Sequence, residues 1–340
     1  MTFEVSRRRL LDLIPSFAGR PLVVAGDYVL DRFVYGHPKR VSREAPVLIL
    51  SFWKEESLPG GAGNTAANVR ALGGLPLPVG AVGEDEAGSA LKRILEERGI
   101  DTAGLISVSG YATPTKTRIL GGGPHSIKQQ IVRYDREQQL PQDDEVAGLL
   151  SGQLSTAARQ ARGAILSDYG YGSVSPEAIA SLRRILPERA PTLVDSRHRL
   201  RLYVGADAVT PNEEELQECF GEPLGDSVEK LAAAGAALRR EVRCRTVLVT
   251  RGSKGMALFE GDGVPALIPV HGTDQVADVT GAGDTVLAAF SLALASGASA
   301  LEAALLANFA GGVVVMKMGT ATVTPEELRA AIEADRHLLS

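Results

Sequence analysis

The feature that most constrains the fold is a regular alternation of short apolar runs, rich in β-branched residues, with longer runs rich in Ala and Leu. Residues 21–26 (PLVVAG) predict a strand, 65–74 a helix, 77–83 a second strand and 86–99 a second helix. Further strands are expected at 163–169, 191–196, 207–212 and 246–252. Such apolar runs are typical of strands buried on both faces, and intervening helices join parallel neighbours. The sequence therefore predicts an α/β fold with a doubly wound, mostly parallel sheet.

Two regions interrupt this alternation. Paired strands without a helix between them are expected at 32–36 with 47–53, and at 115–120 with 126–135. These segments predict a small second β-sheet, inserted into the main domain in two pieces, near 32–56 and 112–136. We expect this sheet to act as a lid. The chain shows neither internal repeats nor a low-complexity linker, so residues 1–340 are predicted to form one domain.

Composition excludes several classes of protein. With 340 residues, 44% of them hydrophobic, the chain can bury a large core and is not disordered. A net charge of −5 argues against a general nucleic-acid binder. Cys219 and Cys244 provide no disulfide framework, which suits a reducing cytoplasm. The N-terminus predicts an amphipathic helix and no signal peptide, and the interrupted apolar region 285–318 predicts packed core helices and no membrane span.

Two common nucleotide fingerprints are absent or weak. The chain has no G-x-x-x-x-G-K-[ST] motif, which argues against a P-loop kinase. Residues 61–66 (GAGNTA) match the loose pattern of dinucleotide-binding loops, but residues 58–60 (LPG) are not a typical strand end. Because this pattern is common by chance, a nicotinamide-dependent dehydrogenase is disfavoured.

Residues 277–290 (ADVTGAGDTVLAAF) contain the most informative motif. Gly281, Ala282 and Gly283 lack bulky side chains, so their backbone N–H groups can approach a ligand. The helix that begins here adds its positive end, which favours a phosphate. Asp284 allows two interpretations: an N-cap of that helix, or a general base that takes the proton of an attacking hydroxyl during phosphoryl transfer.

Other polar motifs follow predicted strands, where doubly wound sheets bind their ligands. Asn212 and Glu215 have the spacing of a helix capping box, but an amide and a carboxylate there also suit Mg²⁺ and its waters. Residues 250–255 (TRGSKG) form either a plain hairpin turn or a clamp on nucleotide phosphates. Asp27 and Asp31 follow the first strand and suit sugar hydroxyls.

Together these motifs resemble those of the PfkB, or ribokinase-type, carbohydrate kinases. Residues 60–66 (GGAGNTA) match the family's N-terminal signature, and 278–289 (DVTGAGDTVLAA) match its C-terminal signature, in the expected order and spacing. Asn212-x-x-Glu215 and Thr250-x-Gly252-x-x-Gly255 match two further family motifs. The resemblance spans residues 20–325. It implies a ribokinase-like fold and an enzyme that transfers phosphate from ATP to a sugar hydroxyl, with Mg²⁺.

The resemblance also implies roles for individual residues. Asp284 would be the base, and the amides of Gly281, Ala282 and Gly283 would form the anion hole. The implied sugar contacts are Asp31, Gly60, Gly61 and Asn64. The implied ligands of Mg²⁺ and the phosphates are Asn212 and Glu215, and the implied nucleotide contacts are Thr250, Gly252, Gly255 and Asn308. Asp278 and Thr280 match positions where family members often bind a monovalent cation such as K⁺. Weaker candidates for phosphate contacts are Lys116, Arg118, Arg133 and Arg197, whose charges are explained equally well by solvated strands and loops.

Within the family, two regions resemble the kinase domains that act on D-glycero-D-manno-heptose 7-phosphate in ADP-heptose synthesis. They are the opening lid segment (GDYVLDRFVYG and VSREAPVLIL, residues 26–50) and the final helix and turn (residues 306–321). The expected reaction is phosphorylation of the 1-hydroxyl. Arg43, where the subgroup usually has proline, and the long connection at 121–126 depart from its pattern. Both lie in the lid, which would select the sugar.

Alternatives remain open. One is a related kinase of another sugar or a nucleoside, such as ribose, fructose, fructose phosphate or adenosine. Another is a sugar-binding protein without catalytic activity on the same fold. The chain ends near residue 340 without the nucleotidyltransferase domain that some heptose enzymes carry, so we expect a stand-alone kinase. The apolar strand at 47–53, with Trp53, would be an exposed face in a monomer, so we expect a homodimer through the lid.

Overall fold

A computed structural model of the chain describes residues 5–123, 128–261, 264–272, 278–317 and 319–335. Its main sheet has nine strands in the order β13-β12-β11-β10-β9-β8-β1-β4-β5. The strands are β1 (Pro21–Gly26), β4 (Leu75–Gly83), β5 (Leu105–Val108), β8 (Ala164–Asp168), β9 (Thr192–Ser196), β10 (Ala208–Val209), β11 (Thr246–Thr250), β12 (Met256–Glu260) and β13 (Ala266–Ile268). All pair in parallel except β12 and β13, which are antiparallel additions at one edge. The predicted α/β fold with a doubly wound, mostly parallel sheet is confirmed.

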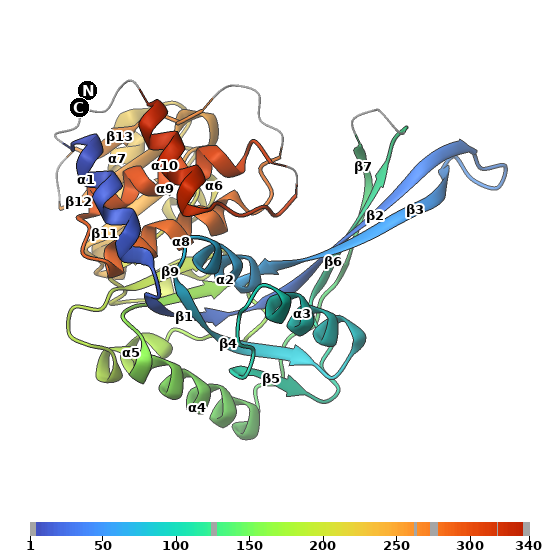
Figure 1. Ribbon diagram of the computed structural model, residues 1–340, viewed down its shortest axis with the longest axis horizontal. Helices are drawn as coiled ribbons and strands as arrows, with labels where there is room; N and C mark the ends of the chain where they lie inside the picture. Colours follow the sequence, from blue (N-terminus) through green and yellow to red (C-terminus); the bar gives the residue numbers. More distant parts are fainter. Residues whose placement is uncertain (1–4, 124–127, 262–263, 273–277, 318, 336–340) are drawn as a thin grey trace.

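Helices cover both faces of this sheet. They are α1 (Arg7–Leu13), α2 (Ala62–Ala71), α3 (Glu86–Glu97), α4 (Asp144–Gln160), α5 (Ala178–Ile185), α6 (Glu213–Phe220), α7 (Val228–Val242), α8 (Ala282–Ala295), α9 (Ala300–Val314) and α10 (Pro325–Ala334). Successive residues of β1 point into different cores: Leu22 and Val24 pack with α8 and α9, whereas Val23 and Ala25 pack with α4 and α5. The helices of the two cores lie on opposite sides of the sheet (Figure 1). This two-sided burial explains why the strands read as continuous apolar runs.

The second sheet projects from the body as a ribbon of four strands (Figure 1). Its order is β3-β2-β6-β7, from β2 (Tyr28–Val41), β3 (Leu48–Gly61), β6 (Thr115–Gly121) and β7 (Gln129–Arg136). β2 and β6 pair in parallel and the outer pairs are antiparallel. We refer to this four-stranded sheet as the lid sheet. The long connection predicted at 121–126 lies partly outside the described residues.

Three predictions about elements need correction. β2 and β3 are longer than expected, because the first residues of β2 and the last residues of β3 continue the lid sheet down to the main body. Residues 58–60 do belong to a strand, since β3 runs to Gly61 and α2 begins at Ala62. Two glycines permit this close junction: a Cβ on Gly60 would lie 2.3 Å from Oδ2 of Asp31, and one on Gly61 would lie 2.6 Å from the Asp27 carbonyl oxygen. The strand expected at 207–212 is shorter, because Asn212 already caps α6.

The N-terminal helix is confirmed as α1. In the part of the chain that the structure describes, no helix combines the length and apolar character needed to span a membrane.

Candidate active site

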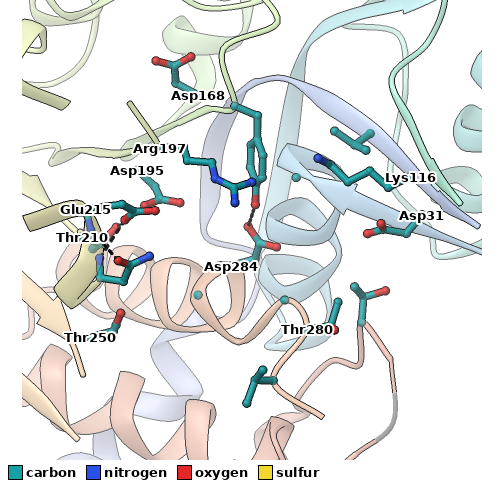
Figure 2. Close-up of a pocket in the computed structure, with 18 of the residues that line it drawn as sticks. Asp31, Lys116, Asp168, Asp195, Arg197, Thr210, Glu215, Thr250, Thr280 and Asp284 are labelled. Carbon is teal, nitrogen blue, oxygen red and sulfur yellow. Dashed lines mark hydrogen bonds between the residues drawn. The ribbon is translucent and has the colours of Figure 1, made fainter. Parts of the chain in front are cut away.

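A cavity of about 660 Å³ opens where the carboxyl ends of the main strands meet the base of the lid sheet. This is the position at which a doubly wound sheet binds its ligand. The predicted residues that line the cavity are Asp31, Gly61, Lys116, Arg118, Arg133, Arg197, Asn212, Glu215, Thr250, Thr280, Gly281, Gly283 and Asp284. Figure 2 shows Asp284 between two groups: Asp31 and Lys116 on one side, and Asp195, Thr210 and Glu215 on the other.

The remaining predicted residues do not line this cavity. Gly60 lies against Asp31, and Asn64 binds Asp284 from α2. Gly252 and Gly255 lie in the turn between β11 and β12, which pair in antiparallel fashion. The backbone at residues 250–255 therefore forms a hairpin turn, as one of the two interpretations predicted. The Asn308 side chain donates a hydrogen bond to the Pro269 carbonyl oxygen at 2.9 Å.

Asp284 lies in the first turn of α8, and its side chain is nearly buried, with 5% of the residue exposed. Its carboxylate accepts hydrogen bonds from Asn64 Nδ2 at 2.8 Å, from the Tyr169 hydroxyl at 3.2 Å and from Thr65 Oγ1 at 3.3 Å. The N-cap interpretation of Asp284 is wrong, because Gly281 holds that position. Asp284 instead faces the cavity with its carboxylate oriented by three side chains.

This environment changes the acidity of Asp284. Burial raises its pKa to about 6, and the nearby charge of Asp31 adds to the rise, while the hydrogen bonds from Asn64, Tyr169 and Thr65 oppose it. The group is therefore mostly ionised at neutral pH but is a stronger base than an exposed aspartate. A pKa close to the working pH is the property that suits general-base catalysis.

The backbone before Asp284 depends on one glycine. Gly281 has φ +77°, and a Cβ there would lie 2.4 Å from Nδ2 of Asn64. Any side chain would thus push away the amide that binds Asp284. Gly281 and Gly283 line the cavity, whereas the Ala282 N–H donates to the Val279 carbonyl oxygen at 3.2 Å. The predicted anion hole therefore lacks the Ala282 amide.

Asp27 has a different role from the one its position suggested. Its buried carboxylate accepts the backbone N–H groups of Tyr169, Tyr171 and Ser173, each at 2.9 Å. These bonds fix the loop at 169–173, which follows β8 and delivers the Tyr169 hydroxyl to Asp284. Asp27 therefore stabilises the site from behind, and Asp31 is the acid that reaches the cavity.

The lid sheet contributes cations to the opposite wall. Arg118 on β6 forms an ion pair with Asp31, and Arg133 lies directly across from Arg118 on β7. Lys116 is buried and its Nζ lies 3.3 Å from the Tyr171 hydroxyl and 3.7 Å from Oε1 of Glu137. Burial, with the nearby charge of Arg133, lowers the pKa of Lys116. This side of the cavity is suited to an anion.

The other side carries the carboxylates of Asp195, Glu214, Glu215 and Glu218. Asn212 and Glu215 do form a capping box on α6: the Glu215 N–H donates to Asn212 Oδ1 at 2.8 Å, and the Asn212 N–H donates to Glu215 Oε2 at 2.9 Å. Glu215 also lines the cavity together with Asp195. Burial raises the pKa of both carboxyls, and the charge of Glu215 raises that of Asp195 further. Two carboxylates in such an environment suit a bound cation.

No group of three or more His, Cys, Asp or Glu side chains placed to hold a metal ion occurs among the described residues. Mg²⁺ commonly keeps several waters and binds through one or two carboxylates. The donors that Asp195 and Glu215 offer are of this kind.

Asp278 holds the turn before α8. Its carboxylate accepts the Thr280 N–H at 2.9 Å and the Gly319 N–H at 3.0 Å. Burial acts to raise the pKa of Asp278, but these hydrogen bonds outweigh it and the pKa is lowered. Asp278 thus ties the 278–281 turn to the turn at 319–322.

Asp195 lies at the polar end of β9, where the strand-end rule points to it, but that position alone suggested no role. Tyr169 directly follows β8, and the same rule extended by one residue would have found it. Thr65 follows Asn64 within the N-terminal signature and carried no separate signal.

Comparison with solved structures supports the fold. Ribokinase from Arabidopsis thaliana, solved with ribose and ATP, matches with a TM-score of 0.72 and 22% identity, over 93% of this chain and all of that one. Phosphofructokinase-2 from Escherichia coli, solved with potassium, matches with a TM-score of 0.72 and 20% identity, over 93% of this chain and 98% of that one. At this identity the likeness concerns the fold.

Sequence relatives are more similar. The bifunctional protein HldE of Mesorhizobium japonicum is 42% identical over 322 residues, which cover 94% of this chain and 63% of that protein. The protein of the same name from Azorhizobium caulinodans is 43% identical over 317 residues, 92% of this chain and 64% of that protein. The chain thus spans less than two thirds of the length of these relatives.

The family model described as "pfkB family carbohydrate kinase" matches residues 24–327, which include both signatures and every residue of the cavity described above. The chain therefore belongs to the pfkB family of carbohydrate kinases.

Proposed function

We propose that this protein transfers the γ-phosphate of ATP, with Mg²⁺, to a hydroxyl of a sugar phosphate, and that this sugar is D-glycero-D-manno-heptose 7-phosphate, phosphorylated at its 1-hydroxyl. The observation that carries the proposal is Asp284, a buried carboxylate with a pKa of about 6 at the start of α8, between a cationic and an anionic side of one cavity. The similarity to the HldE proteins and the motifs at 26–50 and 306–321 support the choice of sugar.

In the proposed mechanism Asp284 accepts the proton of the sugar hydroxyl as its oxygen attacks the γ-phosphorus. The bond between that phosphorus and the β,γ-bridging oxygen breaks, ADP leaves, and the proton passes from Asp284 to solvent. The amides of Gly281 and Gly283 and the positive end of α8 stabilise the charge on the transferring group. Asn64, Thr65 and Tyr169 keep the carboxylate pointed at the hydroxyl. Mg²⁺ near Asp195 and Glu215 would neutralise the nucleotide phosphates.

The cations of the lid sheet favour a phosphorylated sugar over a neutral one. Lys116, Arg118 and Arg133 of the lid sheet and Arg197 after β9 line the cavity. Arg118 pairs with Asp31, Arg133 with Asp135 and Lys116 with Glu137, whereas Arg197 forms no ion pair within the described residues. A neutral sugar would not form ion pairs with these cations, whereas a second phosphate would. We propose that the phosphate that is not transferred binds here, and that closure of the lid sheet over it excludes water from the transfer.

Thr250 is proposed to contact the nucleotide, with Gly252, Gly255 and Asn308 shaping its site, and Asp278 and Thr280 are proposed to hold a monovalent cation such as K⁺. We also propose that the lid sheets of two copies pair in a homodimer, and that the protein works in the cytoplasm, where its free Cys219 and Cys244 would stay reduced.

The test is release of ADP from Mg²⁺-ATP with a panel of acceptors: heptose 7-phosphate, fructose 6-phosphate, fructose, ribose and adenosine. We expect the highest kcat/KM with heptose 7-phosphate. Asp284→Asn should lower kcat by about 10³-fold, within the usual range for removal of a general base. Asp101→Asn, an exposed aspartate on the body, is the matched control and should not change kcat.

The outcomes separate the alternatives. Turnover with another acceptor only would reject the heptose assignment and keep the kinase. If no acceptor in the panel supports ADP release, and Asp284→Asn behaves like the wild type, the protein is a sugar-binding protein without catalytic activity.

A further inference from the structure

A second cavity, of about 480 Å³, adjoins the active site at the base of the lid sheet. It is lined by Leu58 of β3, by the C-terminal ends of α2 and α3, and by residues 320–322. Both helices pack against β3, near the point where the lid sheet leaves the body (Figure 1). Thr320 lines both this cavity and the catalytic cavity.

The charge of this second cavity is entirely positive. Arg70, in the last turn of α2, and Arg98, directly after α3, line it, and no acidic residue does. In the catalytic cavity, by contrast, Arg118 is paired with Asp31. Within the described residues, the side chains of Arg70 and Arg98 form neither a hydrogen bond nor an ion pair. Arg98 is only half exposed, and burial lowers its pKa.

A third polar group points to the same place. Thr320 is 4% exposed, and its Oγ1 is buried without a hydrogen-bond partner in the described part of the chain. Its methyl carbon lies toward the catalytic loop, 3.2 Å from the position of a Cβ on Gly281. Buried hydroxyls are almost always hydrogen-bonded, and the residue that carries this one lines the same cavity as Arg70 and Arg98.

We propose that this cavity binds a phosphate group, as inorganic phosphate or as the ester of a small metabolite, between Arg70 and Arg98. Guanidinium groups present planar arrays of N–H donors that match the oxygens of phosphate. A phosphate here would neutralise both arginines and lie beside Thr320 and Leu58. Because Thr320 contacts the loop of Gly281 and Leu58 belongs to the lid strand β3, binding would bias both the catalytic loop and the base of the lid sheet.

A simpler explanation of the arginines exists. Each lies at the C-terminal end of a helix, where a positive charge is favoured by the helix dipole without any ligand. The two explanations differ in whether the site binds phosphate. Phosphate binding can be measured without turnover, so the test does not depend on the proposed reaction.

The experiment titrates the whole protein, free of nucleotide and sugar, with inorganic phosphate and separately with glycerol 3-phosphate, following binding by ³¹P line broadening and thermal unfolding. Because the catalytic cavity also binds phosphate under our proposal, all variants are made in a Lys116→Gln, Arg133→Gln, Arg197→Gln background, which removes the cations proposed to bind phosphate there. Arg70→Gln and Arg98→Gln remove one charge each from the second cavity. Arg93→Gln is the matched control, since Arg93 is an exposed arginine of α3 outside the cavity.

We expect at least a fivefold rise in the dissociation constant of one or both probes in Arg70→Gln and in Arg98→Gln, and no change in Arg93→Gln. Should Arg98→Gln fail to fold, the exposed Arg70 still provides the test. A dissociation constant that is the same in all variants, or no binding by the background protein, would overturn the proposal and leave the arginines as helix-end charges.

Discussion

At the scale of single residues, the acidity of Asp284 is set by its surroundings. An exposed aspartate titrates near 3.9, whereas burial raises the pKa of Asp284 to about 6. A general base works only when ionised, so activity should be present above this pKa and lost below it. We expect log(kcat/KM) to fall below about pH 6 with a slope approaching one. An acid limb at pH 4 would show that Asp284 is not the titrating base.

The Tyr169 hydroxyl is a positioning group for this base. Its hydrogen bond stabilises the ionised carboxylate and lowers the pKa of Asp284. Tyr169→Phe should therefore move the acid limb of kcat/KM to higher pH, with a several-fold loss of kcat/KM at pH 6.5. Tyr171→Phe is a matched control in the same loop, because the Tyr171 hydroxyl contacts Lys116 and Glu137. This control should leave the acid limb in place and raise KM for the sugar phosphate. Equal shifts in both variants would contradict the assignment.

At the scale of elements, the two ends of α8 provide a direct comparison. Gly281 precedes the helix with φ +77° and Gly297 follows it with φ +90°, but only at Gly281 would a Cβ meet another group. Both substitutions to Ala should destabilise the fold by about 1–2 kcal/mol through backbone strain. Only Gly281→Ala should also lower kcat, by about 10²-fold, because it displaces Asn64 from Asp284. Thermal unfolding and steady-state kinetics on both variants measure the two effects.

The loop at 169–173 is the second element on which the site depends. Three backbone N–H groups of this loop donate to the buried carboxylate of Asp27. Asp27→Ala would leave them without an acceptor, so we expect a loss of about 2–4 kcal/mol in the free energy of unfolding, with a fall in kcat as Tyr169 loses its place. Denaturant unfolding tests this. Asp143→Ala, which removes the N-cap of α4, should cost about 1 kcal/mol without affecting kcat.

At the scale of the whole molecule, the lid sheet exposes apolar side chains. On β3, Phe52 is 68% and Trp53 46% exposed, and Tyr134 on β7 is 64% exposed. Such a surface on a projecting sheet is typical of a protein interface. We expect a dimer by light scattering at micromolar concentration, and a monomer after Phe52→Glu. Val264→Glu, at an even more exposed apolar residue outside the lid sheet, should remain dimeric. A monomeric wild-type protein would reject the interface.

The sequence by itself determined the order of the elements, the doubly wound sheet and the insertion of a second sheet. It could do so because burial on one or two faces leaves a periodic pattern that is local in the chain. The glycine loop before Asp284 could also be predicted, since its run of small residues directly precedes Asp284 in the chain. These features depend on neighbours a few residues away.

Only the tertiary structure decided which partner each polar side chain uses. Asp27 and Asp31 are close in the chain and have the same side chain. Asp27 nevertheless accepts hydrogen bonds from the backbone of the 169–173 loop, whereas Asp31 pairs with Arg118. Tyr169 and Asp284 are 115 residues apart, and no pattern in the sequence links them. The same holds for Arg70 and Arg98, which share one cavity without an acid. The physical reason is that a hydrogen bond or ion pair depends on distances of a few ångströms, and these are fixed only when the helices and strands have packed together.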